Sequence, residues 1–122
     1  MPMLSIAYRL WVEKDGVPVF GPGLFELLFL VNSKGSLHSA AKELRMSYRA
    51  AWGMVRVHEE RLGISLLEKG RHGRTGAHLT EKGLQVLKYY EGITSRVSRL
   101  ISSNEINTLL KNMEELSDSD DS

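Results

Sequence analysis

Apolar residues occupy every second position near the N-terminus: Leu4, Ile6, Tyr8, Leu10 and Val12. A turn signal at Asp15-Gly16 and a second short apolar run, Val17 to Phe20, follow them. Asp-Gly between two such runs favours a tight turn, so this region predicts a β-hairpin. Trp11 interrupts the alternation, and we expect it either in the core or at an interface.

Three helical patterns follow the hairpin. Gly23 to Ser33 is apolar on most sides, which predicts a largely buried helix that ends at Gly35. Ser36 is suited to cap a second helix. That helix carries a single apolar stripe: Leu37, Ala40, Ala41 and Leu44. After a turn of about three residues, Ser47 can cap a third helix, about Tyr48 to Leu62, and this spacing predicts a helix-turn-helix.

The third helix has two chemically different sides. Its predicted buried side consists of Ala51, Trp52, Val55 and Leu62. Its opposite side, with the N-cap, consists of Ser47, Tyr48, Arg49, Gly53 and Arg56. Because glycine inside a helix costs about 1 kcal/mol relative to alanine, Gly53 indicates the close approach of another molecule. A shallow, cationic helix side is typical of a DNA-groove contact.

A second hairpin is predicted after this helix. Ile64 to Lys69 and Ala77 to Thr80 resemble short strands that enclose a glycine-rich, basic segment, Gly70 to Gly76. We expect the cationic residues of this wing to contact the DNA backbone: Arg71, His72 and Arg74. The alternative is a flexible hairpin whose charges serve solubility.

The C-terminal part of the chain predicts a long helix capped by Thr80. Its apolar seam alternates steps of four and three: Val86, Tyr90, Ile93, Val97 and Leu100. Such a seam predicts a dimerisation helix, although the same stripe can also pack onto its own domain. A further amphipathic segment runs from Ile106 to Leu116, and the last six residues contain only Ser and Asp, which favours disorder.

These elements predict a mainly α protein with small β (α+β). The predicted fold is a winged helix-turn-helix with an N-terminal β-hairpin and a long C-terminal dimerisation helix. We expect a DNA-binding domain over residues 1–79, a helical dimerisation segment over 80–116 and a disordered acidic tail over 117–122.

The charge distribution separates the middle of the chain from its end. Between Lys34 and Lys88 there are eleven Lys and Arg against five Glu, whereas Glu105 to Ser122 has one Lys against six acidic residues. The middle is therefore suited to a polyanion and the end is not.

Several classes of function have little support in the sequence. Apolar runs are far shorter than a membrane span, and no signal peptide is apparent. The chain has no Cys, and its four His lack the i, i+4 spacing of a helical ligand pair, so we expect no metal site and no cofactor. There is no nucleophile elbow, P-loop or dinucleotide-binding context, so we do not expect an enzyme.

A family resemblance rests on one long stretch, "GSLHSAAKELRMSYRAAWGMVRVHEERLGISLLEK", and on "LTEKGLQVL" after the basic loop. These residues resemble the N-terminal winged-helix domain of ModE-type, molybdate-responsive regulators, and more distantly the LysR-type DNA-binding domain. The resemblance covers about residues 4 to 100. It implies a prokaryotic, cytoplasmic, dimeric DNA-binding regulator, here without the ModE-type oxyanion-binding domain, because only about twenty residues follow Leu100.

The sequence thus predicts a homodimeric transcription regulator that binds double-stranded DNA. We expect Arg49 and Arg56 at guanine edges or phosphates, with Ser47 and Tyr48 on phosphate oxygens. Ser36 is the remaining predicted DNA contact. The alternatives are a winged-helix protein-interaction module and an architectural protein that binds DNA without sequence preference.

Overall fold

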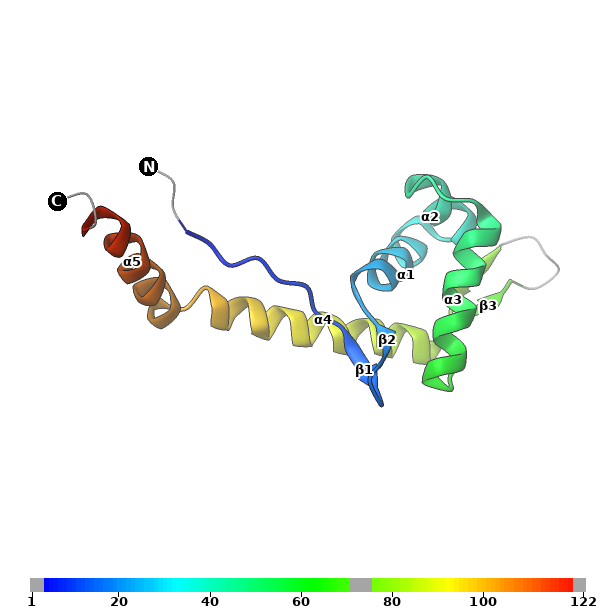
Figure 1. The fold of residues 1–122 in the computed structure, drawn as a ribbon. Helices are drawn as coiled ribbons and strands as arrows, with labels where there is room; N and C mark the ends of the chain where they lie inside the picture. Colours follow the sequence, from blue (N-terminus) through cyan, green and yellow to red (C-terminus); the bar gives the residue numbers. More distant parts are fainter. Residues whose placement is uncertain (1–3, 71–75, 120–122) are drawn as a thin grey trace. The chain divides into compact units, whose positions relative to one another are not determined.

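The computed structural model describes residues 4–70 and 76–119. Within these residues the chain forms five helices and two antiparallel two-stranded sheets. Figure 1 shows the course of the chain through these elements. This is the mainly helical fold with little β-structure that the sequence predicts. The chain divides into two compact units: a core unit, Arg9–Glu91, and a terminal unit, Met1–Tyr8 with Gly92–Ser122.

The core unit begins with the predicted hairpin, β1 (Val12–Lys14) and β2 (Val17–Phe20). Asp15 and Gly16 both have positive φ, 52° and 78°, which is the backbone of the tight turn that Asp-Gly favours. The first strand is shorter than predicted, because residues 4–11 are not in a strand. An alternating pattern forms a strand only where a second strand is available for hydrogen bonding. Here β2 pairs with Val12–Lys14 and not with the residues before them.

Trp11 does not lie fully in the core. Half of its surface is exposed (50%), and its indole ring covers Gly21, where a Cβ atom would meet the ring at 2.6 Å. The sequence predicts Trp11 either in the core or at an interface, and its position at an interface stays a prediction.

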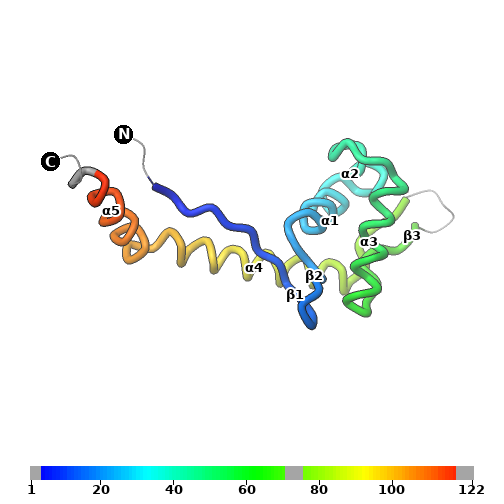
Figure 2. Tube along the Cα trace, viewed as in Figure 1, coloured from blue at the N-terminus to red at the C-terminus, as the bar shows by residue number. Residues whose placement is uncertain are grey.

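The three predicted helices are present as α1 (Pro22–Lys34), α2 (Leu37–Glu43) and α3 (Tyr48–Leu62). Gly35 ends α1 with φ 93°, and its N–H donates to the Val31 carbonyl at 2.9 Å. Ser36 and Ser47 cap the next two helices, since their hydroxyls accept from the backbone N–H groups three residues later at 3.1 and 3.0 Å. Figure 2 shows the chain turning sharply between α2 and α3.

One continuous cluster of buried side chains joins these helices to both hairpins. Its largest fully buried members are Phe20, Leu27, Leu28, Val31, Leu37, Val55 and Leu66. The alanines of the α2 stripe, Ala40 and Ala41, are buried against α1 and α3 together with Ala51. Small side chains at these positions allow the helices to approach closely, and this packing fixes the angle at which α3 is presented.

The second hairpin consists of β3 (Leu67–Lys69) and β4 (Ala77–Leu79), paired from Leu67 with Leu79 to Lys69 with Ala77. Both strands are shorter than predicted. Just beyond them, the Gly70 N–H donates to the Gly76 carbonyl at 2.7 Å. The predicted wing contacts Arg71, His72 and Arg74 lie outside the described residues.

Helix α4 (Glu81–Ile101) begins with the predicted cap, since Thr80 Oγ1 accepts from the Gly83 N–H at 2.9 Å. Gly83 is buried where the start of α4 passes the backbone of Leu66, and a side chain there would meet the Leu66 carbonyl group. Close backbone contact, rather than a turn, therefore requires glycine at this position.

Tyr90 on α4 packs within the core unit. It is 5% exposed, its ring lies 4.8 Å from Phe20 and 5.3 Å from Phe25, and its hydroxyl donates to the Leu10 carbonyl at 2.7 Å. A dimerisation role for Tyr90 stays a prediction, and its side chain is already buried within its own chain. A seam read from sequence spacing does not distinguish a contact with the same chain from a contact with a second copy.

The terminal unit contains the end of α4 and helix α5 (Asn104–Ser119). Ser103 caps α5, accepting from the Ile106 N–H at 3.3 Å. The helix continues through Ser119, three residues into the stretch expected to be disordered. Hydrogen bonding along an established helix extends it into residues of low intrinsic propensity.

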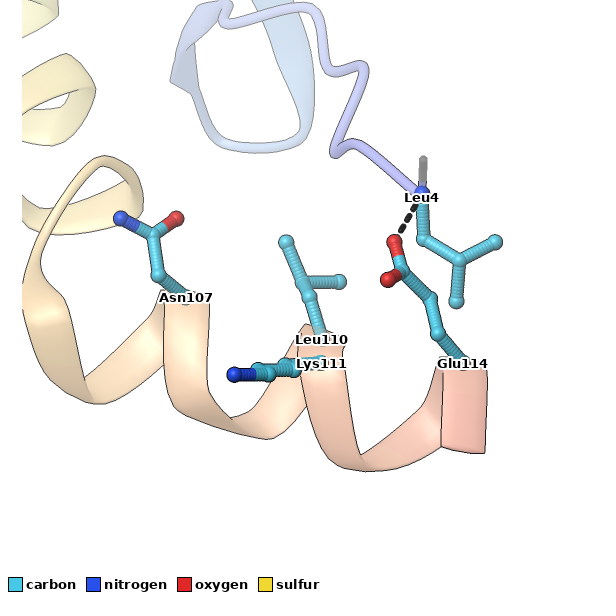
Figure 3. A pocket seen from close by; sticks show the side chains of 5 residues that line it. All are labelled: Leu4, Asn107, Leu110, Lys111 and Glu114. Carbon is cyan, nitrogen blue, oxygen red and sulfur yellow. Dashed lines mark hydrogen bonds between the residues drawn. The ribbon is translucent and has the colours of Figure 1, made fainter. Parts of the chain in front are cut away.

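A shallow hollow of about 550 Å³ lies in the terminal unit, where residue 4 meets α5. Its lining residues are Leu4, Asn107, Leu110, Lys111 and Glu114. Figure 3 shows the Glu114 carboxylate accepting a hydrogen bond from the Leu4 N–H, at 2.6 Å. None of the described side chains in this unit is buried. No helix in the described part of the chain is long and apolar enough to span a membrane.

Candidate nucleic-acid interface

Helix α3 presents most of the predicted DNA contacts on one exposed side. We call this side the recognition face: Tyr48, Arg49, Gly53 and Arg56. All four residues are exposed, whereas Ala51 and Val55 on the opposite side of the same helix are fully buried. The core therefore holds α3 from behind and leaves the recognition face exposed.

Neither arginine of the recognition face has an ion-pair partner among the described residues. Among the described residues the recorded ion pair is Lys34–Glu43, with 4.0 Å between Nζ and Oε2, and it involves neither Arg49 nor Arg56. Guanidinium groups remain charged at physiological pH and present several N–H donors in a plane. The face is thus equipped to bind phosphate oxygens or guanine base edges.

Gly53 leaves a gap in the middle of this face. A Cβ atom at Gly53 would meet no atom of the described residues within 4 Å, apart from the adjoining residues and the helix's own backbone. Internal packing therefore does not require glycine here, although glycine weakens a helix interior. The gap is instead suited to the close approach of another molecule's backbone.

The hydroxyls of Ser36 and Ser47 act first as helix caps. Ser36 also donates to the Ser39 hydroxyl at 3.1 Å, which engages its hydrogen within the protein. Ser47 is exposed, and accepting the Ala50 N–H leaves its own O–H available as a donor. Of the two, Ser47 is better placed to donate to a phosphate oxygen.

Trp52 is less buried than predicted. It packs against the core but keeps part of its ring accessible, and the Arg56 guanidinium lies over that ring, 4.8 Å from its centroid. The Trp52 ring also packs in a T-shaped arrangement with Tyr48, with 6.4 Å between the ring centroids, and the Tyr48 centroid lies 6.0 Å from that of His38 on α2. A line of aromatic rings thus joins the first and second helices of the motif beneath the arginine.

Two residues that the sequence analysis did not single out also shape this surface. Glu59 Oε2 accepts from the backbone N–H groups of Leu66 and Leu67 at 2.7 and 3.2 Å, which ties α3 to the base of the second hairpin. Arg45, in the turn before α3, has φ 57°, a conformation that favours glycine. The only sequence signal for either was a charged residue near a loop, which is too common to be specific.

The described residues contain no group of three His, Asp or Glu side chains arranged to hold a metal ion. The chemistry that the surface offers is therefore that of cations, hydroxyls and aromatic rings. These groups bind polyanions and base edges.

Comparisons with known proteins agree with this geometry. Residues 23–84 match the family described as "Bacterial regulatory helix-turn-helix protein, lysR family". The chain is also 33% identical over 96 residues to the molybdenum-pterin-binding protein MopB of Rhodobacter capsulatus, covering 77% of this chain and 35% of MopB. The chain thus spans about a third of this relative's length, and the resemblances to LysR-type and ModE-type regulators are both supported.

Solved structures show the same fold. The DNA complex of the CbnR DNA-binding domain matches with a TM-score of 0.52 and 26% identity, over 63% of this chain and 85% of that chain. The complex of the BenM DNA-binding domain with benA site 1 DNA matches with a TM-score of 0.52 and 25% identity, over 66% and 90%. The match to CbnR, a LysR family transcriptional regulator, covers only 26% of that chain.

Proposed function

Because this chain belongs to the lysR family of bacterial regulatory helix-turn-helix proteins, we propose that it binds duplex DNA and regulates transcription. The observation that carries the proposal is the recognition face: two exposed arginines, which have no ion-pair partner in the described part of the chain, flank a glycine gap on the second helix of the motif. DNA complexes among the structural neighbours support the same reading. Such a regulator works where the bacterial DNA is, in the cytoplasm.

In this proposal α3 enters the major groove. Arg49 and Arg56 contact guanine edges or phosphates, and Ser47 and Tyr48 set the helix against the phosphate oxygens. The gap at Gly53 lets the helix backbone come close to the DNA. The wing residues Arg71, His72 and Arg74 extend the contact along the adjacent backbone, from a hairpin whose base is held by the bond between Gly70 and Gly76.

We propose further that the protein acts as a homodimer. A helix-turn-helix dimer meets two half-sites one turn of DNA apart, which explains why such regulators need a partner. The terminal unit has an unburied apolar surface that a second copy can cover: Ile93, Leu100, Leu109, Met113 and Leu116 are all exposed. Val86 and Val97, which are half-buried, complete the predicted contacts, while Tyr90 is committed to the core unit.

The test starts with selection of DNA fragments from the source genome by the full chain. Arg49→Ala and Arg56→Ala are then compared with the parent on the selected duplex at several salt concentrations. Each variant is expected to lose about 1–3 kcal/mol of binding free energy and, where the arginine meets phosphate, to reduce the salt slope by about one. Lys14→Ala, which removes one charge from the N-terminal hairpin, is the control and should bind normally.

Two outcomes contradict the proposal. Unchanged affinity and salt dependence in both arginine variants would show that the recognition face does not meet DNA. Equal binding to promoter and random DNA would indicate an architectural protein instead of a regulator.

For the dimer, sedimentation of the purified chain at micromolar concentration is expected to give twice the chain mass.

A further inference from the structure

The side chain of Arg56 rests on an aromatic ring one helical turn away. Its guanidinium carbon lies 4.8 Å from the centroid of Trp52, and the two residues are four positions apart on the exposed part of α3. No carboxylate of the described residues is within ion-pair distance of Arg56. The ring is therefore the recorded contact that holds this arginine in the free protein.

The ring itself is fixed on two sides. Trp52 packs against the buried core, so its contacts within the protein determine where the ring lies. The indole packs in a T-shaped arrangement with Tyr48, with the two rings nearly perpendicular at 83° and their centroids 6.4 Å apart. Tyr48 in turn faces His38 of α2 at 6.0 Å. Arg56 thus lies on a rigid platform that spans both helices of the motif.

A guanidinium above a ring keeps its hydrogen-bonding capacity. Its N–H donors lie in the plane of the group, so an arginine that rests on an aromatic face can still bind a guanine edge or a phosphate with two parallel bonds. A free arginine loses considerable rotamer entropy when it binds, and prior placement on the ring reduces that loss.

We infer that Trp52 is a positioning residue for DNA recognition: it holds Arg56 in its binding arrangement, so that base preference at the Arg56 contact depends on Trp52. This inference rests on the proposed DNA-binding function. It assigns to a core-packed aromatic residue a role in specificity that does not require the ring to touch DNA.

The test is a double-mutant cycle with Trp52→Leu, Arg56→Ala and the combined variant, measured as affinity for the selected duplex. Trp52→Leu is expected to weaken binding by about two- to fivefold, the range of a cation–π contact at an exposed site. In the Arg56→Ala background the same substitution should have almost no further effect. Because the two residues act as one unit, the combined loss should be clearly less than the product of the single losses.

A second readout separates positioning from a general loss of structure. Affinities for single-base variants of the duplex are expected to show relaxed preference at the same base pair for Trp52→Leu and for Arg56→Ala. Trp52→Phe keeps an aromatic face and should restore most of that preference. Trp11→Leu removes the other tryptophan, which directly precedes the N-terminal hairpin, and should leave the preference unchanged.

The outcomes distinguish this inference from the proposed function. If Trp52→Leu weakens binding equally with and without Arg56, or relaxes no base preference, the ring does not act through Arg56 and the inference is wrong. If the parent protein selects no DNA, or Arg49→Ala and Arg56→Ala both bind normally, the DNA-binding proposal itself fails. Thermal unfolding of each variant keeps the comparison at temperatures where all are folded.

Discussion

The core unit and the terminal unit obtain their stability in different ways. Every buried apolar residue of the described chain lies in the core unit, from Val19 to Tyr90. In the terminal unit the apolar residues of α5 remain in contact with solvent, including Leu109 at 58% exposed. Both units consist of amphipathic elements, yet only one of them has a core within its own chain.

This difference shows why a similar hydrophobic pattern has two outcomes. Burial of apolar surface contributes about 25 cal/mol per Å² removed from water, and the hairpins and three helices of the core unit supply surfaces that cover one another. The terminal unit offers α5, the end of α4 and an extended N-terminal segment, which leave their apolar faces open. Under the proposed function, a second copy supplies the missing surface.

The largest expected effect separates the two units directly. Leu27→Ala removes a fully buried side chain and should lower the free energy of unfolding by about 2–5 kcal/mol at any protein concentration. Leu109→Ala should change the unfolding of dilute monomer very little but weaken self-association. Denaturant unfolding and sedimentation, each at two protein concentrations, measure both effects.

The comparison fails if Leu109→Ala destabilises the monomer as much as Leu27→Ala does. That result would mean that α5 packs into a core of its own chain. Lys111→Ala, on the same helix, is the matched control. It should leave the free energy of unfolding unchanged and should alter self-association only by a small electrostatic effect.

An intermediate effect is expected from the polar link within the core unit. Glu59→Ala leaves the N–H groups of Leu66 and Leu67 without their carboxylate acceptor, which should cost about 1–3 kcal/mol of stability. Because this carboxylate anchors the base of the second hairpin, amide hydrogen exchange should accelerate there first. Glu60→Ala is the control, because Glu60 is the next residue along the helix and its side chain is exposed. If Glu60→Ala lowers the free energy of unfolding as much as Glu59→Ala does, Glu59 does not anchor the hairpin in this way.

The smallest effect has opposite signs for folding and for binding. Gly53→Ala should stabilise the protein by up to about 1 kcal/mol, because alanine favours a helix interior and no protein atom obstructs its Cβ. The same methyl group should weaken binding to the selected duplex. Thermal unfolding and a DNA titration measure the two effects.

Gly23→Ala provides the matched control for Gly53→Ala. Gly23 lies in the first turn of α1, and its Cβ position is also unobstructed. Gly23→Ala should therefore leave the affinity for DNA unchanged. If Gly53→Ala binds as tightly as the parent, the glycine gap has no role in recognition.

The helix boundaries were predictable because local chemistry sets them. Ser36, Ser47 and Thr80 cap their helices as expected, and Gly35 and Gly63 end theirs with positive φ. Each of these features depends on residues within one turn of the chain. The exposure of Arg49, Gly53 and Arg56 also follows from the helical period once one side of α3 is assigned to the core.

Other features depended on partners that sequence spacing does not identify. The first strand is shorter than its alternation suggests because β2 pairs with only three of its residues. Tyr90 continues a regular seam, yet its hydroxyl reaches the carbonyl of Leu10, eighty positions away. The anchoring of the second hairpin by Glu59 has the same origin.

By itself the sequence determined the helices, their caps, the short turn between α2 and α3, and the charge of the side that α3 exposes. These properties follow from interactions between residues near one another in the chain. Only the tertiary structure decided which apolar residues are buried and which stay open, and that Arg56 rests on Trp52 while the ring rests on the core. Such outcomes depend on which distant surfaces meet, and the free energy of burial is obtained only where they do.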